Sequence, residues 1–376
     1  MNYIKPFLLV LCLSLGISFQ TGSAQQISAR FSNQPAAGNA FLINGNTLQF
    51  QQNSAVINGQ NVRNVEAFHM NGRRSLISFV LRNSGSRQLG LYSTNGALIN
   101  SVSDLSLSGD DPSVMSYPLI DGRIVVRQNI ANFTIYDTYG NISETVSNSS
   151  GSKKGESISR LAMDSGGSNI ILYNPKINYS NSTGSRAQRL GSDGYLDHLY
   201  SSRDRTIHKL HITDSGSFIL VLTKSPGTND RVVLLDRFGN KLDQFEFEEE
   251  LLDARFALQE NHLVAYSSGR IRVFNLFTGE NLGSTSIRGT GNIFYADYSP
   301  QDNQILALTG AKSSRTDYIN SVEAHAVHIG KRELDDTEVV NSYLTHPQIP
   351  LQMERTAVNQ YTVTGGSGDI TISTDF

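Results

Sequence analysis

Apolar and polar residues alternate over short stretches of this chain, and turns that contain glycine separate the stretches. Alternation with a period of two predicts β-strands with one buried face. In TIYDTYGNISET (134–145), Asp137 can cap backbone amides and Gly140 can adopt the positive φ of a tight hairpin. The unit recurs as VLLDRFGNKLDQ (233–244), RVFNLFTGENLGS (272–284) and GLYSTNGALINS (90–101). No later stretch has a convincing helical period, so we expect an all-β protein.

A second repeated pattern interleaves with the first. It consists of an apolar residue, a polar turn and then a strongly apolar strand, as in ITDSGSFILVLT (212–223). Seven copies begin at Met70, Ile120, Met163, Ile212, Leu258, Tyr298 and Val358. A period of about 40–50 residues with four strands per unit is typical of the blades of a β-propeller. We therefore predict a propeller of seven four-stranded blades, with a β-solenoid or two β-sandwiches as alternatives.

The two ends of the chain indicate how the ring closes. The residues after Val358 suffice for two strands only, so the seventh blade is incomplete. Ahead of the first copy lies NAFLINGNTLQFQQNSAVI (39–57), which has the pattern of further strands. We predict that the N-terminal strand or strands complete the last blade and so remove an exposed sheet edge. The predicted organisation is a signal peptide at 1–24, an N-terminal tail at 25–38 and the propeller domain at 39–376.

Two segments resemble known propeller families. YSPQDNQILALT (298–309) resembles the "SPDG…LA" strand of WD40-type propellers, and LLDRFGNKL (234–242) resembles the hairpin of NHL and related bacterial propellers. The resemblance is diffuse, covers most of residues 40–376, and implies an exported bacterial-type propeller repeat protein without implying a function. The chain has no tryptophan. This absence counts against quinoprotein dehydrogenases, whose blades carry tryptophan docking motifs, and against sialidase-type Asp-boxes.

The N-terminal segment has the features of an export signal. Lys5 precedes the apolar run FLLVLCLSLGISF (7–19), and small residues at 22–24 suit cleavage after Ala24. The run is shorter than the roughly 20 apolar residues of a membrane span, and Cys12 lies inside it, where a lipid anchor is not expected. A retained N-terminal anchor is the alternative. We expect a periplasmic, secreted or envelope-associated protein with no membrane span after cleavage.

The composition of the mature chain narrows its chemistry and its partners. The only cysteine lies in the signal, so thiol nucleophiles, iron–sulfur clusters and Cys-ligated zinc are not expected in the mature protein. The net charge of −3 offers no general attraction to nucleic acid or to an anionic membrane. We expect a monomer whose partner is a protein, a peptide or a glycan.

Motifs for metal, cofactor or catalytic chemistry are weak. His208 and His211, like His325 and His328, are three residues apart in predicted strands, where such side chains point to opposite faces. The acidic segment SLSGDDPS (106–113) lacks the ligand spacing of a calcium loop. No nucleophile elbow, phosphate loop or dinucleotide fingerprint occurs. We predict no metal and no cofactor, and no catalytic residue can be assigned.

Two long polar segments are predicted to be loops between the second and third strands of their blades. They are NPKINYSNSTGSRAQR (174–189) and GAKSSRTDYINSV (310–322). Long loops on a rigid scaffold often carry binding specificity, and disorder is the competing interpretation.

The candidate binding site comes from one equivalent position in each repeat. Three residues before each copy of the second pattern, the chain has Ala67, Tyr117, Arg160, Lys209, Arg255, Tyr295 and Arg355. In a propeller this position lies on the strand that lines the central channel. Tyr117, Arg160, Lys209, Arg255, Tyr295 and Arg355 are therefore predicted to form a basic, aromatic-edged channel mouth that binds acidic groups. Alternatively, the cations pair between blades with Glu66, Asp253 or Glu354.

These features favour an exported, non-enzymatic binding or scaffold propeller that recognises a protein, peptide or glycan on the channel-mouth face. A propeller hydrolase or lyase that acts on a polysaccharide or another acidic substrate is one alternative. A structural component of the cell envelope is the other. The fold by itself does not choose among the three.

Overall fold

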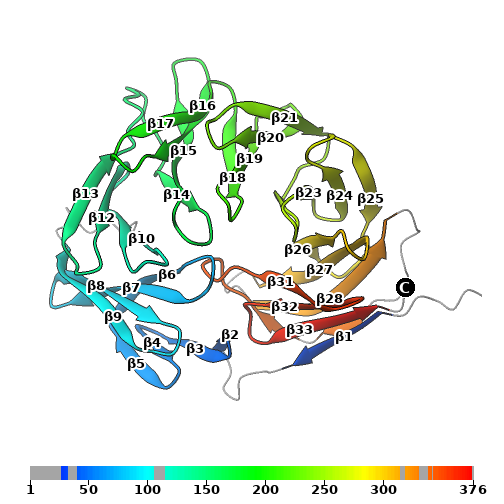
Figure 1. Ribbon diagram of the computed structural model, residues 1–376, viewed down its shortest axis with the longest axis horizontal. Helices are drawn as coiled ribbons and strands as arrows, with labels where there is room; N and C mark the ends of the chain where they lie inside the picture. The colour runs from blue at the N-terminus through cyan, green and yellow to red at the C-terminus, as the bar shows by residue number, and fades with distance from the viewer. Residues whose placement is uncertain are drawn as a thin grey trace, which may run out of the picture.

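The structure is a computed structural model that describes residues 27–32, 40–105, 115–313, 318–329, 338–340 and 342–374. Within these ranges every regular element is a β-strand. The strands form eight antiparallel sheets arranged as a ring (Figure 1). The predicted propeller architecture is therefore confirmed. The predicted signal peptide at 1–24 and the whole acidic segment at 106–113 lie outside the described residues.

The sheets follow one another along the chain, and each runs from an inner strand outward. The first contains β2 (Ala40–Ile43), β3 (Asn46–Gln51), β4 (Ser54–Ile57) and β5 (Gln60–Arg63). The second contains β6 (Val65–Met70), β7 (Leu76–Asn83), β8 (Ser86–Ser93) and β9 (Leu98–Leu105). The third contains β10 (Met115–Pro118), β11 (Ile124–Arg127), β12 (Asn132–Tyr136) and β13 (Ile142–Ser147). The fourth contains β14 (Arg160–Met163), β15 (Ile170–Asn178), β16 (Thr183–Leu190) and β17 (Leu196–Ser202).

The remaining four sheets complete the ring. The fifth contains β18 (Thr206–Ile212), β19 (Phe218–Lys224), β20 (Asp230–Asp236) and β21 (Lys241–Phe247). The sixth contains β22 (Asp253–Phe256), β23 (His262–Tyr266), β24 (Arg270–Asn275) and β25 (Asn281–Ser286). The seventh contains β26 (Asn292–Ser299), β27 (Gln304–Lys312), β28 (Tyr318–His328) and β29 (Glu338–Val340), and β30 (Tyr343–Leu344) also pairs with β28. The eighth contains β31 (Gln352–Ala357), β32 (Gln360–Thr364), β33 (Asp369–Thr374) and β1 (Ile27–Ser32).

The ring closes through the N-terminal strand, as predicted. Strand β1 pairs antiparallel with β33 along a register that runs from Ile27 opposite Thr374 to Ser32 opposite Asp369. The two chain ends therefore share one sheet, at the lower right of Figure 1. The closing residues lie in the segment predicted to be a tail, whereas residues 40–57, predicted to help close the last blade, belong to a separate sheet.

This separate first sheet explains why eight sheets are present where the repeated pattern predicted seven. Its strands are only four to six residues long. They turn at Asn44-Gly45 and Asn58-Gly59, where all four residues have positive φ, as two-residue hairpins require. The second strand of this sheet, β3, has one fully buried residue, Leu48. It therefore lacks the strongly apolar strand that marked the other seven units.

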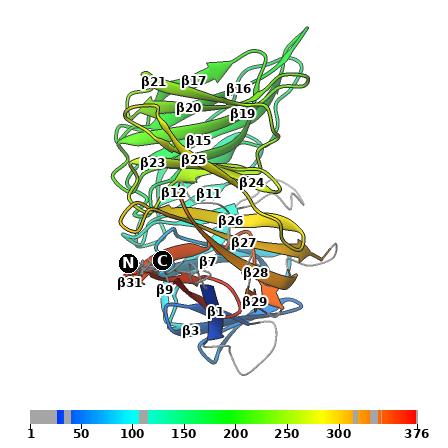
Figure 2. The ribbon, with the colours of Figure 1, turned by 90° about the vertical axis from the view of Figure 1, so that its right-hand side faces the viewer.

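The two predicted loops are mostly strand. Residues 174–189 belong largely to β15 and β16, which continue as a long hairpin past a break in register between Asn174 and Ile177. The segment 310–322 belongs largely to the adjoining ends of β27 and β28. Figure 2 shows the β15–β16 sheet in the upper part of the molecule. Most of the described residues of the two segments therefore belong to hairpin strands.

Glycines at the tips of the outer hairpins let neighbouring sheets approach closely. Gly239, between β20 and β21, has a φ of 85°. A Cβ atom at this position would lie 2.8 Å from the Cα and carbonyl oxygen of Leu199, in the outer strand of the preceding sheet. Gly140 stands in the same relation to Ser101, at 2.7 Å from its carbonyl oxygen. The repeated Gly therefore serves both the turn and the contact between blades.

We expect Gly239→Ala to lower the free energy of unfolding by about 3 kcal/mol, because a positive φ and a backbone clash both oppose the methyl group. The matched control is Gly85→Ala. Gly85 has a φ of 94°, and a Cβ atom there would meet no heavy atom within 4 Å, so the cost should be about 1 kcal/mol. Urea unfolding of both variants measures the difference. Equal losses would show that the contact between sheets contributes nothing at this position.

Candidate functional site

A cavity of about 720 Å³ lies on the channel side of the ring, and we call it the channel cavity. Its walls come from the inner strands β6, β10, β14 and β18, together with residues of β11 and β15. The segment 347–350, which precedes β31, lines it as well. In Figure 1 this segment and the turn after β6 meet near the middle of the ring.

Among the described residues, the charged side chains that line the channel cavity are all basic. They are Arg127, Arg160 and Lys209, and none of the described lining residues is Asp or Glu. The chain as a whole carries a net charge of −3, so the positive character is local. A concave surface with one sign of charge concentrates ligands of the opposite sign. The cavity is therefore suited to an anion.

The three cations are held differently. Arg127, at the end of β11, is only 5% exposed, and its Nη1 donates to the backbone oxygen of Ser159 at 2.9 Å. Arg160 and Lys209 are exposed residues. Burial fixes one cation in the wall, while the other two can adjust to a ligand.

A β-bulge brings consecutive residues of β18 into the same wall. The pairing register between β18 and β19 shifts between Ile207 and Lys209, which disturbs the alternation of a regular strand. As a result His208 and Lys209 both line the channel cavity. Burial lowers the pKa of His208, and the positive charges of Lys224 and Lys209 act in the same direction.

Neutral polar groups sit between the cations and the apolar lining. The rings of His69 and Tyr117 lie 4.5 Å apart between centroids. Burial lowers the pKa of His69 to about 4, helped by the positive charges of His346 and Arg127. Burial raises the pKa of Tyr117 to about 12. Both side chains are therefore uncharged at pH 7.

All six residues of the predicted site lie on inner strands, but the structure divides them into two groups. Tyr117, Arg160 and Lys209 line the channel cavity. Arg255, Tyr295 and Arg355 are not among its lining residues. The predicted ring of equivalent side chains is therefore realised on one side of the channel only.

Arg255 and Tyr295 instead belong to a cluster between the sixth and seventh sheets. The guanidinium of Arg255 lies over the ring of Tyr295, with 4.9 Å from Cζ to the centroid. Its Nη2 is 4.0 Å from Oδ2 of Asp297, which also accepts a hydrogen bond from the Tyr295 hydroxyl at 3.0 Å. Burial raises the pKa of Asp297, and Arg255 opposes that rise. Here the cation stabilises a buried carboxylate.

Arg355 joins the last two sheets in the same way. Its Nε and Nη2 each donate to a carboxylate oxygen of Asp302 at 2.7 Å, and the Tyr361 hydroxyl donates to the same group. The hydrogen bond from Arg355 lowers the pKa of Asp302. Pairing between blades was the alternative for these cations, but the carboxylates differ from those expected. Two of the expected ones have other partners: Glu66 pairs with Arg87 and Asp253 with His211, each at 2.7 Å.

Several residues that line the channel cavity were not predicted from the repeated pattern. Arg127 lies on a second strand, and the segment 347–350 lies between repeats, so neither belongs to the aligned position. The scarcity of methionine in the sequence could nevertheless have indicated three further lining residues. Met70, Met115 and Met163, three of only five in the chain, all line this cavity.

The histidine pairs do not form metal sites. His211 contacts Asp253 of the next sheet, whereas His208 lines the channel cavity. The two rings therefore have different neighbours. His325 is buried against Thr309, with 3.0 Å between Nε2 and Oγ1. Among the described residues, no group of three or more His, Cys, Asp or Glu side chains is arranged to hold a metal ion.

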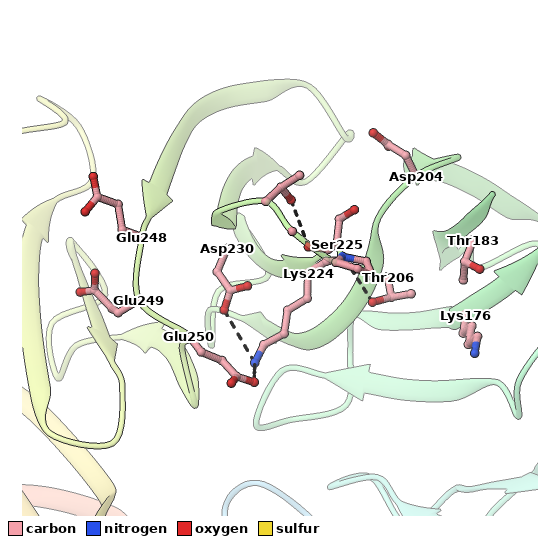
Figure 3. Close-up of a pocket in the computed structure, with 13 residues that line it drawn as sticks. Lys176, Thr183, Asp204, Thr206, Lys224, Ser225, Asp230, Glu248, Glu249 and Glu250 are labelled. Carbon is pink, nitrogen blue, oxygen red and sulfur yellow. Dashed lines mark hydrogen bonds and ion pairs between the residues drawn. The ribbon is translucent and has the colours of Figure 1, made fainter.

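A second cavity, of about 630 Å³, lies where β15, β18, β19 and β20 meet the connection after β21 (Figure 3). Acidic side chains dominate it, including Glu248, Glu249 and Glu250. Lys224 reaches across it, with Nζ 2.9 Å from Glu250 and 3.7 Å from Asp230. Several of its charged groups thus have partners within the protein. The channel cavity is therefore the stronger candidate for a ligand.

Comparison with known proteins identifies the fold but not a family. No protein-family description and no curated protein matches this chain. Among solved structures, the Dos1 propeller aligns with a TM-score of 0.51 and 10% identity over 92% of this chain and 93% of its own. The chain has the β-propeller fold. BamB from Moraxella catarrhalis aligns with this propeller at a TM-score of 0.48 and 13% identity over 93% of this chain and 100% of BamB.

Within the ranges that the structure describes, the chain has no helix with the length and apolar character needed to cross a membrane.

Proposed function

We propose that this chain is an exported, non-enzymatic binding propeller whose channel cavity takes an anionic group of a protein, peptide or glycan partner. The observation that carries the proposal is the lining of that cavity, to which the described part of the chain contributes three cations and no carboxylate. Export is supported by the charged start, the apolar run and the small residues of 1–24. The protein then acts in the periplasm, on the envelope or outside the cell.

The energetics of the cavity favour recognition of carboxylates or sulfates. A charge-assisted hydrogen bond contributes about 1.5–3 kcal/mol, and less where both groups stay in water. Arg127 is already buried and oriented, so a ligand does not bear the cost of ordering it. Arg160 and Lys209 add accessible charge from two further strands. The three together suit a ligand with more than one negative group.

The titratable groups of the cavity support binding over acid–base catalysis. A general acid or base works best with a pKa near the working pH. The pKa of His69 is about 4 and that of Tyr117 about 12, so burial moves both away from neutrality. Burial also raises the pKa of Tyr173, and Arg160 opposes that rise. These directions do not favour the hydrolase or lyase alternative.

Titration calorimetry with hexaglutamate and with an oligogalacturonate tests the proposal on the full mature chain. Arg160→Gln/Lys209→Gln should weaken binding of both probes at least tenfold, because two accessible charges leave the cavity. The matched control is Arg237→Gln/Lys241→Gln, which removes the same charges from the exposed β20–β21 hairpin. The control should bind within twofold of the wild type. Equal weakening by both pairs, or no binding to the wild type, would contradict the proposal.

A further inference from the structure

The channel cavity has two unlike ends. Four antiparallel strands return the chain to the face from which it started, so consecutive inner strands start from the same face of the ring. We call the end where they start the mouth and the opposite end the floor. Arg160 is the first residue of β14 and Met163 the last, which separates them by about 10 Å.

The cations lie toward the mouth. Arg160 starts β14 and pairs with Tyr173. Arg127 pairs with Met115, the first residue of β10. Lys209 lies at the middle of β18. Two of the three cations of the cavity thus lie at the mouth, and the third lies midway along its strand.

The floor is apolar and narrowed by turns. Met70 is the last residue of β6 and Met163 the last of β14, and both line the cavity. Beyond them the turns of the second and fourth sheets touch, because a Cβ on Gly72 would lie 3.0 Å from the Cα of Ser165. Arg73 Nε donates to the Ser165 hydroxyl at 3.2 Å. The contact between these turns therefore narrows the cavity at the floor.

We propose that the ligand is a peptide segment in which carboxylate side chains alternate with large apolar ones. This inference rests on the anion-binding function proposed above. Carboxylates would meet Arg160, Lys209 and Arg127 toward the mouth, while an apolar side chain would reach Met163 and Met70. Thioether side chains are flexible and polarizable, so they adapt to apolar groups of different shape.

Other anions match fewer of these features. An acidic glycan carries carboxylates, but it has no large apolar group for the methionines. A fatty acid has an apolar chain, but it offers one carboxylate to three cations that come from three different sheets. A peptide with acidic and apolar residues satisfies both halves of the cavity. The cavity volume of about 720 Å³ lies in the range of about 300–1,000 Å³ common for ligand sites.

Two capped peptides of equal charge test the inference on the full mature chain: Glu-Leu-Glu-Leu-Glu and Glu-Ser-Glu-Ser-Glu. We expect the leucine peptide to bind at least tenfold more tightly in fluorescence anisotropy. Met163→Gln should reduce that preference to about twofold and leave the affinity for the serine peptide unchanged. Met163→Leu, which keeps the site apolar, should retain the preference. A thermal melt of each variant checks that it is folded.

The remaining outcomes separate this inference from the proposed function. Equal affinity for the two peptides, unaffected by Met163→Gln, would overturn the inference while anion binding stands. Tighter binding of oligogalacturonate or of dodecanoate than of the leucine peptide would overturn the choice of a peptide. Absence of binding to every anion would overturn the proposed function together with this inference.

Discussion

A mature chain that starts at Asn33, and so lacks β1, is expected to aggregate or to melt well below the full mature chain. Strand β1 pairs with β33 through six residue positions. Its Ile27 and Ala29 are buried in the core between the last two sheets, and Phe31 packs on Tyr343 with 5.6 Å between ring centroids. Losing these contacts and the pairing should remove roughly 5 kcal/mol or more. That is a large part of the 5–15 kcal/mol typical of a folded domain.

The deletion also leaves β33 with an unpaired edge, which can pair with another molecule. Size-exclusion chromatography and a thermal melt measure both effects. A synthetic peptide of residues 25–32 should restore much of the melting temperature by strand addition. The same peptide with Ile27 and Phe31 replaced by Ser is the control and should not. A truncated chain that remains monomeric and melts like the full mature protein would show that β1 does not close the ring.

Arg255→Met is expected to lower the free energy of unfolding by about 2–4 kcal/mol at pH 7, because the carboxylate of Asp297 loses its nearby cation. Asp297 is 4% exposed in its side chain and Arg255 is 25% exposed. Burial has already raised the pKa of Asp297, and removing Arg255 should raise it further. A carboxyl group whose folded pKa is raised destabilises the protein above that pKa, and protonation relieves the cost. The stability lost in the variant should therefore shrink as the pH falls toward about 3.9, the pKa of an aspartic acid in the unfolded chain.

A double-mutant cycle separates charge from packing in this cluster. Asp297→Asn in the Arg255→Met background removes the unpaired negative charge of Asp297. It should recover at least half of the stability lost at pH 7. Urea unfolding at pH 7 and pH 4 measures each corner of the cycle. An equal loss at both pH values, with no recovery in the double variant, would mean that Arg255 contributes through packing on Tyr295 alone.

Local patterns in the sequence determined the strands, the turns and the strand that each candidate residue occupies. Alternation sets which face of a strand is buried, and Asp, Asn and Gly at the hairpins set the turns. These are properties of neighbouring residues, so the aligned position fell on an inner strand in all seven copies of the pattern. The short first sheet was missed because its second strand buries little beyond Leu48.

Only the tertiary structure decided which inner-strand cations line the channel cavity. Arg160 and Arg255 occupy equivalent positions, yet one lines an open cavity and the other is opposed to Asp297 of the next sheet. Partners such as Asp297 and Asp302 come from neighbouring sheets, tens of residues away along the chain. Their position depends on how far each sheet is rotated and shifted around the ring, which no local pattern encodes. The repeat therefore placed the charges on inner strands, and the packing of one blade against the next determined which of them line the channel cavity.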